Sequence, residues 1–350
     1  MPNWAYNQLI CRTDADFERV KAALLDDEGK VDFNRLVPQP ELIRKRSFIF
    51  GDEFAAIARY IDPEHPVDAE AVRAKARELY PNIAFVEEIP PSLMIDRQSD
   101  DPEYPALTDD RIAKVVEASQ DRNEVAKLAE SWDVFSRQDN FPEHYTTLEN
   151  FCEQAFRALI LYGFPDWYSW STAFWGTKWN ARDTHVFEEK RSIIFDTAWA
   201  PVPPLMGYLS EQLGVALYMR YTEEQFSACA GELVFDSGNL VECNEPEDAL
   251  GIFKIASLMN DSEQQCYRYW PEEGEIIFAG WCESAEEARA AAAKGEGTEG
   301  EADENEWLLS LPKFEDLPVI DTTSQIFERF LAGAGEGAGE QGASAGETRV

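Results

Sequence analysis

The sequence lacks most of the signatures that identify an enzyme. None of its six cysteines stands at C-x-x-C spacing from another, so neither a zinc site nor a disulfide framework is indicated. The phosphate loop G-x-x-x-x-G-K-[ST], the nucleophile motif G-x-S-x-G and the zinc motif H-E-x-x-H do not occur. We therefore assign no catalytic residue, no metal ligand and no cofactor, and we favour a protein without enzymatic activity.

Histidine is also scarce, with three copies in 350 residues: His65, His144 and His185. The first two stand beside prolines or turn residues, where a surface position is favoured. His185 lies in the acidic segment 183–189, where it could pair with a carboxylate as a general base. A surface histidine in an acidic loop is the better interpretation, and carboxylates are so abundant that no catalytic pair stands out.

Basic residues are few: Lys and Arg number 31 against 67 Asp and Glu, which gives a formal net charge of −36. Residues 282–350 contribute −11 of this charge, which leaves −25 for residues 1–281. Such a field repels phosphate backbones, so direct nucleic-acid binding is not expected and a basic protein is the favoured partner. The simpler alternative is that the solvated acidic faces only maintain solubility.

Long apolar runs are missing as well. The start, MPNWAYN, has no basic segment followed by an apolar one, and no later stretch is apolar over the roughly 18 residues that a spanning helix needs. We expect a cytoplasmic protein without membrane contact. Hydrophobic residues at 44% are nevertheless enough for a sizeable core, and a chain of 350 residues favours two domains with accessory segments.

The periodicity of apolar residues predicts an α+β protein. The chain opens with an expected strand at 4–12, a helix at 14–25 and an extended segment at 31–37, which is a β-α-β opening. Helices are expected next, at 52–60, 68–80, 108–132 and 146–162. The last of them has a T-x-x-E capping box at 146–149 and a stop signal at Gly163.

The second half of the sequence alternates strand and helix patterns. Strands are expected at 191–197, 215–221 and 229–235, and helices at 203–213 and 246–258. A turn at 236–239 lets the third strand continue as a hairpin. The β-α-β-β-α order is that of a ferredoxin-like unit, with 276–279 as the candidate last strand and both helices on one face of the sheet.

Composition divides the predicted elements into five segments. They are an N-terminal α+β region at 1–162, a ferredoxin-like domain with an aromatic cluster at 163–281, an acidic linker at 282–306, a docking segment at 307–330 and a disordered Gly/Ala tail at 331–350. The docking segment is rich in Trp, Leu, Ile and Phe, so we expect part of it to pack on the body or on a partner.

One aromatic constellation stands out, because five of the ten tryptophans fall within residues 167–199. Tryptophan is favoured at binding surfaces, so a groove with a polar floor is one interpretation, and an aromatic core that closes the sheet is the other. The centre of the cluster adds a glycine that permits close backbone approach. The candidate binding residues are Trp175, Gly176, Lys178, Trp179, Asn180, Trp199, Asn7 and Asn34.

Four motifs in order resemble a known family. They are PNW followed by Asn7 at 2–7, VDFNRLVPQP at 31–40, WGTKWN at 175–180, and FDTAW at 195–199 with three prolines behind it. Together they resemble the YubB-like (Api-type) family of plasmid and phage proteins. The resemblance implies a ferredoxin-like domain in the C-terminal half and a bacterial mobile-element setting, and it supplies no biochemical function and no catalytic residue.

Two functions of different classes follow. The first is a non-catalytic interaction protein whose acidic surface engages a basic host partner, a class that includes nucleic-acid-binding proteins. The second is a small-molecule or nucleotide-processing enzyme that uses the Trp-rich groove around 175–180. The scarcity of histidine and the lack of a phosphate loop favour the first. RNA binding by an RRM-like sheet would need basic flanks, which this acidic chain lacks.

The two low-complexity segments generate a direct prediction. Residues 283–306 and 332–350 have too little apolar surface to offset the entropy of ordering, so we expect their amide protons to exchange almost at once. Hydrogen exchange followed by mass spectrometry measures this. Protection in either segment comparable to that of the body would contradict the prediction, and a helix at 285–294 is its weakest point because alanine and glutamate favour helix.

Overall fold

The fold is described from a computed structural model, which covers residues 3–45, 52–81, 84–85, 106–135, 147–223, 229–259, 267–278, 310–313 and 321–333. The chain divides into two compact units. Unit 1 comprises Met1–Leu36 and Trp175–Val350, and unit 2 comprises Val37–Phe174. This division differs from the predicted boundary between 162 and 163, because the N-terminal segment folds with the second half of the chain. The predicted linker and tail, 282–306 and 331–350, lie outside the described residues apart from 331–333.

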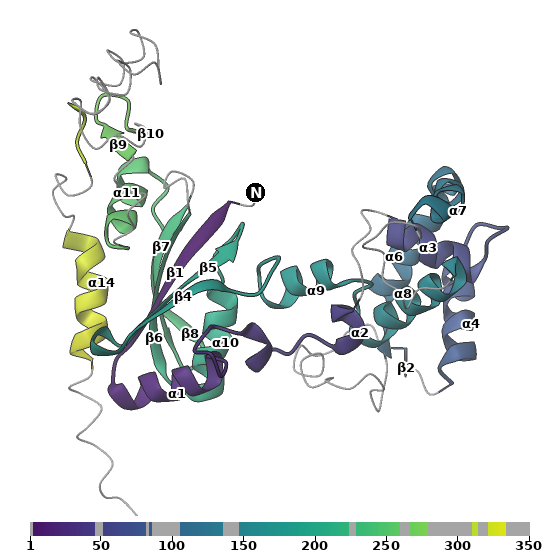
Figure 1. Cartoon of the computed structure of the whole chain (residues 1–350), viewed down its shortest axis with the longest axis horizontal. Coiled ribbons are helices and arrows are strands. Elements are labelled where there is room, and N and C mark those ends of the chain that lie inside the picture. Colours follow the sequence, from purple (N-terminus) through teal and green to yellow (C-terminus); the bar gives the residue numbers. More distant parts are fainter. Residues whose placement is uncertain are drawn as a thin grey trace, which may run out of the picture. The chain divides into compact units, whose positions relative to one another are not determined.

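Unit 1 is built on a six-stranded antiparallel sheet with the order β4-β5-β1-β6-β7-β8. Its strands are β1 (Trp4–Cys11), β4 (Arg182–Phe187), β5 (Ser192–Ala198), β6 (Ala216–Glu223), β7 (Ala230–Asp236) and β8 (Asn239–Asn244). The N-terminal strand β1 lies inside the sheet, between β5 and β6 (Figure 1). The core of unit 1 is therefore assembled from segments that are far apart in the sequence.

Four strands and two helices of unit 1 form the ferredoxin-like arrangement. In chain order they are β1, α1 (Asp14–Leu24), β4, β5, α10 (Pro203–Leu213) and β6. The strand order β4-β5-β1-β6 is a split β-α-β fold, which β7 and β8 extend at one edge. The predicted α+β class and ferredoxin-like domain are confirmed. The first strand and helix of the fold, however, come from the N-terminus, and unit 2 is inserted between α1 and β4.

Two strand predictions are wrong. β10 (Glu275–Phe278) covers most of the predicted last strand, but it pairs with β9 (Tyr267–Trp270) in a separate two-stranded sheet. The segment 31–37 is not extended, because Phe33–Arg35 form the 3-10 helix η1, capped by Asp32, and Val31 makes one isolated bridge with Leu25. The opening of the chain is therefore a strand and a helix followed by a turn.

The sequence patterns do not predict β4. Its residues, RDTHVF, alternate poorly, and the register with β5 shifts between Arg182 and His185. Such a bulge interrupts the period of two on which strand prediction depends. His185 is exposed on this edge strand and not in a loop.

Different helices cover the two faces of the sheet. On one face α1 lies beside α10, whose Gly207 packs closely on Phe235 of β7. On the other face α11 (Ala249–Ser257) packs Ile252 and Ile255 on Ala230 of β7. Residues 230 and 235 point to opposite faces because side chains alternate along a strand. The expectation that 203–213 and 246–258 share one face is therefore wrong.

A C-terminal helix completes the second face. α14 (Asp321–Ala332), labelled in Figure 1, lies mostly within the predicted docking segment 307–330. It packs Ile326 and Phe330 on Tyr218 of β6. The ring of Phe327 adds an aromatic contact with Tyr218, at a centroid distance of 5.0 Å. The Arg12 guanidinium anchors the helix end, since its Nε donates to the Phe330 carbonyl over 2.8 Å.

A buried ion pair lies within the sheet beside α11 and α14. Arg220 of β6 and Glu232 of β7 are directly opposite in register, and their Nη2 and Oε1 atoms are 3.2 Å apart. The Glu232 side chain is 0% exposed and that of Arg220 is 8% exposed. The Tyr218 hydroxyl donates to Glu232 and accepts from Arg220 Nη2, and burial raises the pKa of this phenol. Asn244 of β8 donates to the second carboxylate oxygen over 3.3 Å.

Unit 2 is a helical body with a two-stranded parallel ribbon. Its elements are α2 (Glu41–Arg44), α3 (Asp52–Ile61), α4 (Ala69–Leu79), β2 (Ala84–Phe85), β3 (Ala106–Leu107), α6 (Asp109–Gln120), α7 (Arg122–Phe135), α8 (Leu148–Tyr162) and α9 (Trp167–Phe174). The helices α3, α4, α6 and α8 lie together in Figure 1. The core gathers between them, where Ile57, Val72, Val115 and Phe156 are fully buried.

The helix predictions in unit 2 need two corrections. The predicted helix at 108–132 is two helices, because Asp121 leaves the helical conformation and its carboxylate accepts from the amides of Asn123 and Glu124. Helix α8 is capped by Thr147 and not by Thr146, since the Thr147 hydroxyl accepts from Asn150 N. Its stop at Gly163, which has φ 82°, is confirmed.

The buried ion pair generates a stability prediction. Replacing Arg220 with Met removes the cation and leaves the Glu232 carboxylate uncompensated, so we expect a loss of about 3–5 kcal/mol in the free energy of unfolding. Urea denaturation measures this loss. Lys30→Met is the control, since Lys30 and Glu28 form an ion pair at the surface and an exposed pair contributes less than about 1 kcal/mol. Equal losses for both variants would contradict the prediction.

Candidate functional site

The tryptophan cluster at 167–199 is divided between the two units. Trp167 and Trp170 belong to α9 of unit 2, whereas Trp175, Trp179 and Trp199 belong to unit 1. Trp175 is 4% exposed, and its ring packs on Phe33 at a centroid distance of 5.9 Å. The structure therefore places Trp175 in an aromatic core, while the two other tryptophans of unit 1 reach the surface.

Asn180 and Asn34 hold backbone turns in place. The Asn180 Oδ1 accepts from the Phe33 amide over 2.9 Å, and its Nδ2 donates to the Asp32 carboxylate over 2.6 Å. The Asn34 Nδ2 donates to the same carboxylate oxygen over 2.9 Å. Asp32 thus joins the turn after α1 to the segment that precedes β4.

Asn7 lies in the middle of the sheet and is fully buried. Its Nδ2 donates to the Thr197 hydroxyl over 2.9 Å and to the Ala5 carbonyl over 3.0 Å, and its Oδ1 accepts from the Val202 amide. These contacts give the side chain a structural role between β1, β5 and the start of α10. None of its polar atoms faces solvent.

Gly176 has a different role from the one that its sequence context suggests. A Cβ built on this residue meets no atom within 4 Å, so no neighbouring backbone requires the glycine. Its φ of 77° lies in the left-handed region, which glycine adopts at little cost. The glycine therefore turns the chain between the buried Trp175 and the segment that carries the buried Thr177, the half-buried Lys178 and the exposed Trp179.

Three tryptophans and two cations form a row at one end of the sheet. We define this tryptophan row by Trp4, Trp179, Trp199, Lys178 and Arg182. The Lys178 Nζ lies 4.6 Å from the ring centroids of both Trp179 and Trp199. The Arg182 guanidinium lies 4.6 Å from the Trp4 centroid, and the Trp4 and Trp179 rings are 6.2 Å apart. Trp179 is 37% exposed and Trp199 48% exposed, which is unusual for this residue type.

The backbone fixes the position of Trp199. Its φ is 73°, a conformation that is rare for a bulky residue. The Trp199 amide donates to the Asn3 carbonyl over 2.8 Å, and the Thr177 hydroxyl donates to the Ala198 carbonyl over 2.8 Å. These bonds hold a strained residue so that its ring stays at the surface, and such strain is concentrated at functional sites.

The row continues onto the sheet face that carries Trp4. Residues 4, 6 and 8 of β1 share this face because side chains alternate, and Tyr6 is half-buried there. Tyr6 lies opposite Asp196 of β5, which in turn lies opposite Arg182 of β4. Helices α1 and α10 cover the other face of these strands, where Phe195 packs on Phe33.

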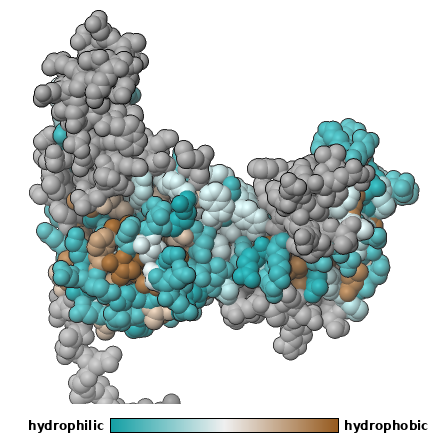
Figure 2. Space-filling model, viewed as in Figure 1, coloured by the Kyte–Doolittle hydropathy of each residue, from teal (hydrophilic) through white to brown (hydrophobic). Residues whose placement is uncertain are grey.

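The opposite edge of the sheet has a different character. β8 is the last strand in the order, and Leu240 and Val241 on it are 53% and 54% exposed. The register with β7 shifts here, with Leu240 opposite Phe235 and Glu242 opposite Val234, so Val241 is a bulged residue. The charged residues at 236–248 are all acidic. On the face that Figure 2 shows, most of the described surface is hydrophilic and apolar residues occupy small areas.

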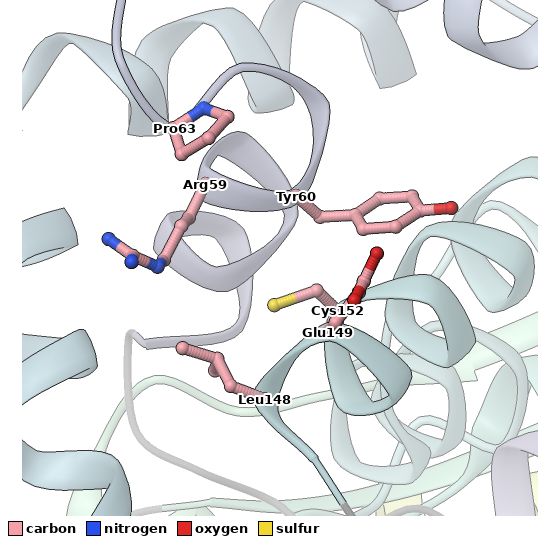
Figure 3. Close-up of a pocket in the computed structure, with 6 residues that line it drawn as sticks. All are labelled: Arg59, Tyr60, Pro63, Leu148, Glu149 and Cys152. Carbon is pink, nitrogen blue, oxygen red and sulfur yellow. The ribbon is translucent and has the colours of Figure 1, made fainter.

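Unit 2 contains a pocket of about 330 Å³ between α3 and α8. It is lined by Arg59, Tyr60, Pro63, Leu148, Glu149 and Cys152 (Figure 3). Figure 3 shows the Cys152 sulfur directed into the gap between Arg59 and Leu148. The volume is near the lower limit for ligand pockets, about 300 Å³. None of the residues selected from the sequence lines it.

The titratable groups give no sign of nucleophilic or metal chemistry in the part of the chain that the structure describes. Burial raises the pKa of the Cys11 thiol to about 12, and burial together with Glu223 raises that of Cys229 to about 12. These thiols are protonated at neutral pH and are poor nucleophiles. No group of three His, Cys, Asp or Glu side chains among the described residues could hold a metal ion. None of the described helices is long and apolar enough to cross a membrane.

A comparison with protein families identifies one part of the chain. Residues 174–267 match the family model described as a ferredoxin-like domain in Api92-like protein. This part of the chain is similar to the ferredoxin-like domain of Api92-like proteins. The match begins within one residue of Trp175, where unit 1 resumes after the insertion. It confirms the resemblance inferred from the sequence motifs, two of which, 175–180 and 195–199, lie inside the matched residues.

One solved structure is also similar to this chain. The crystal structure of a protein api92 from Yersinia pseudotuberculosis is similar at 13% identity and a TM-score of 0.31, over 70% of this chain and 98% of that chain. A search of curated proteins gave no match. Strand β1 and helix α1, which complete the ferredoxin-like arrangement, lie outside residues 174–267.

Two members of the tryptophan row, Trp4 and Arg182, were not among the residues selected from the sequence. Their positions in the chain are about 175 residues from each other, and only the pairing of β1 and β4 with β5 brings them together. The single signal for Trp4 is its place in the PNW motif of the family resemblance. Arg182 has none, because strand β4 itself is not predicted.

The contacts around 175–180 predict which substitutions affect stability. Trp175→Ala opens a cavity in the core and should cost about 3–5 kcal/mol. Asn180→Ala leaves the Phe33 amide without its acceptor and should cost about 1–3 kcal/mol. Lys178→Ala removes only surface contacts and should cost less than about 1 kcal/mol. Urea midpoints measure the three values, and a Lys178→Ala loss as large as that of Trp175→Ala would contradict this assignment.

Proposed function

We propose that the protein is a non-catalytic interaction protein, and that the acidic edge strand β8 is the surface to which a basic partner adds a strand. The observation that carries this proposal is the combination of an edge position, two exposed apolar side chains and a local excess of carboxylates. The edge position offers main-chain hydrogen bonds, the apolar side chains offer contact surface, and the carboxylates select positive charge.

The charge around β8 is strongly one-sided. Residues 229–259 hold six carboxylates and one base, Lys254. One of the six, Glu232, is buried and paired with Arg220. The five others are exposed or half-exposed: Asp236, Glu242, Glu245, Glu247 and Asp248. Arg329 of α14 pairs with Glu242 over 3.0 Å, which leaves a clear negative excess that selects a basic partner.

The backbone of β8 supplies the attachment. An edge strand presents unpaired amide and carbonyl groups, and a partner that adds a strand gains main-chain hydrogen bonds there. No described strand pairs with the outer side of β8. Leu240 and Val241 add apolar surface, and carboxylates flank them. Lysine is one of the side chains that protect edge strands from pairing, and β8 has none.

The setting of the interaction follows from the family resemblance. A plasmid or phage protein meets the basic, nucleic-acid-binding proteins of its host in the cytoplasm, and we propose one of these as the partner. The second function that the sequence suggested, an enzyme that processes small molecules or nucleotides, requires a Trp-rich groove. Its residues Trp175 and Asn180 have structural roles, so binding without chemistry has the stronger support.

A pair of synthetic peptides tests the strand addition. We expect a ten-residue peptide of alternating lysine and valine to bind the full-length protein, and its glutamate counterpart not to bind, because the carboxylates around β8 select positive charge. Methylation of every second peptide nitrogen should abolish binding, since it removes main-chain donors. Fluorescence anisotropy of labelled peptides measures the dissociation constants, which should rise steeply with salt.

Matched variants locate the surface. Glu247→Gln should weaken peptide binding by about two- to fivefold at low salt, as expected for a surface charge, and Val241→Lys should weaken it more. Asp27→Asn is the control, because Asp27 is an exposed carboxylate on unit 1 that is remote in sequence from β8. Equal effects of Asp27→Asn and Glu247→Gln, or equal binding of the two peptides, would contradict the proposal. If the bulge at Val241 only protects the edge, neither peptide binds.

A further inference from the structure

The tryptophan row is a second surface, separate from the acidic strand β8. It lies at the β4-β5-β1 end of the sheet, and β6 and β7 stand between it and β8. The function proposed above leaves its residues without a role. Three features of the row, its ring spacing, its local charge and its fixed backbone, define the ligand that it fits.

Rings and cations are interleaved along the row, in the order Trp199, Lys178, Trp179, Trp4 and Arg182. Lys178 bridges Trp179 and Trp199, and Arg182 lies on the Trp4 ring, as the 4.6 Å distances show. A ligand that fits this arrangement has flat groups, which stack on the exposed rings, and negative groups, which reach the Lys178 ammonium and the Arg182 guanidinium. Nucleotides in a single strand combine both, since every base has a π-face and every linkage carries one phosphate charge.

The local charge permits such a ligand although the protein as a whole is acidic. Close to the row, the two bases Lys178 and Arg182 face two acids: Asp183, whose carboxylate is 3.7 Å from Arg182, and Asp196, which lies opposite Arg182, so the local charge is near zero. Beyond about 8 Å other charges are largely screened at physiological ionic strength. The net charge of −36 therefore opposes long-range approach of nucleic acid, but it does not determine the potential at the row.

The surface is also organised before any ligand binds. The Trp199 ring is held outward by a backbone with φ 73°, whose amide is bonded to Asn3. Tyr6 of β1, which is half-buried, lies on the same face of the strand as Trp4 and adds a further aromatic ring beside the row. A sheet that presents aromatic side chains on its central strands can stack successive unpaired bases.

We propose that the tryptophan row binds a short single-stranded nucleic acid, with bases stacked on Trp179 and Trp199 and phosphates held by Lys178 and Arg182. Duplexes are excluded from this mode because their bases are already stacked on each other. Recognition by stacking tolerates any base sequence, so we expect little difference between thymidine and adenosine strands.

Anisotropy of a fluorescent deca-thymidylate in 100 mM salt tests the proposal on the full-length protein. Trp179→Ala and Trp199→Asn should each raise the dissociation constant by about tenfold to a hundredfold, the range of a lost base stack. Asparagine tolerates positive φ, so the second variant keeps the backbone. Thermal unfolding confirms that both variants are folded.

Charge variants distinguish binding at the tryptophan row from non-specific electrostatic attraction between the strand and the protein. Lys178→Ala and Arg182→Ala should weaken binding and each lower the slope of log K against log salt by about 0.7, the value for one phosphate contact on a single strand. Lys30→Ala, an exposed lysine elsewhere on unit 1, should leave the slope unchanged. The duplex of deca-thymidylate with deca-adenylate should bind at least tenfold more weakly than the single strand.

Three results would overturn the inference: no binding of the single strand, duplex binding as strong as single-strand binding, or full affinity in both tryptophan variants. Competition by thymidine monophosphate at concentrations equal to the strand would show that one nucleotide suffices and that the row is not a strand-binding surface. The peptide experiment on β8 is independent of each of these outcomes, so either proposal can fail alone.

Discussion

The pairing of Arg220 with Glu232 is the contact on which the arrangement of unit 1 depends most. The carboxylate is buried between strands and hydrogen-bonded to Tyr218 and Asn244, while the guanidinium also reaches the Leu258 carbonyl at the end of α11. Four strands and one helix therefore meet at a single charge pair, because Gln8 of β1 accepts from Arg220 as well. Any other register of β6 and β7 would separate the two charges inside the core, at a cost of several kcal/mol.

Local sequence patterns predict a helix or strand well where one face of that element is buried and the other is exposed. The Thr13 cap, the proline start of α10 and the glycine at the end of α8 are visible in the sequence and are present in the structure. The order of strands in space was not predictable in the same way. No periodicity indicates that β1 pairs with β5, because these strands are separated by the whole of unit 2. Strand β4 was missed since a bulge breaks its alternation.

The candidate binding residues rest on amino-acid type alone, and the type of a residue does not tell whether its side chain lies at the surface or in the core. Asn7 and Asn180 have the composition of a binding site but satisfy buried backbone groups. Trp175 and Trp179 are four positions apart, yet one is in the core and the other at the surface, because the left-handed Gly176 turns the chain between them. Among the candidates only Trp179 and Trp199 are exposed, and Lys178 between their rings is half-buried. Their partner ring, Trp4, comes from the other end of the ferredoxin-like arrangement, and only the tertiary structure associates it with them.

The insertion of unit 2 between α1 and β4 has a consequence for synthesis on the ribosome. Strand β1 emerges before unit 2 and before its neighbour β5. Phe195 of β5, whose carbonyl accepts from Asn7 of β1, follows Asn7 by 188 residues. At roughly 5–20 residues per second, β1 waits on the order of 10–40 s before its first neighbour exists. During that time the complete sequence of unit 2 emerges, whereas the strand that forms the centre of the final sheet has both edges unpaired. Translation thus supplies the central strand of the sheet first and its neighbouring strands last, and the nascent chain carries an apolar strand that its own fold cannot yet cover.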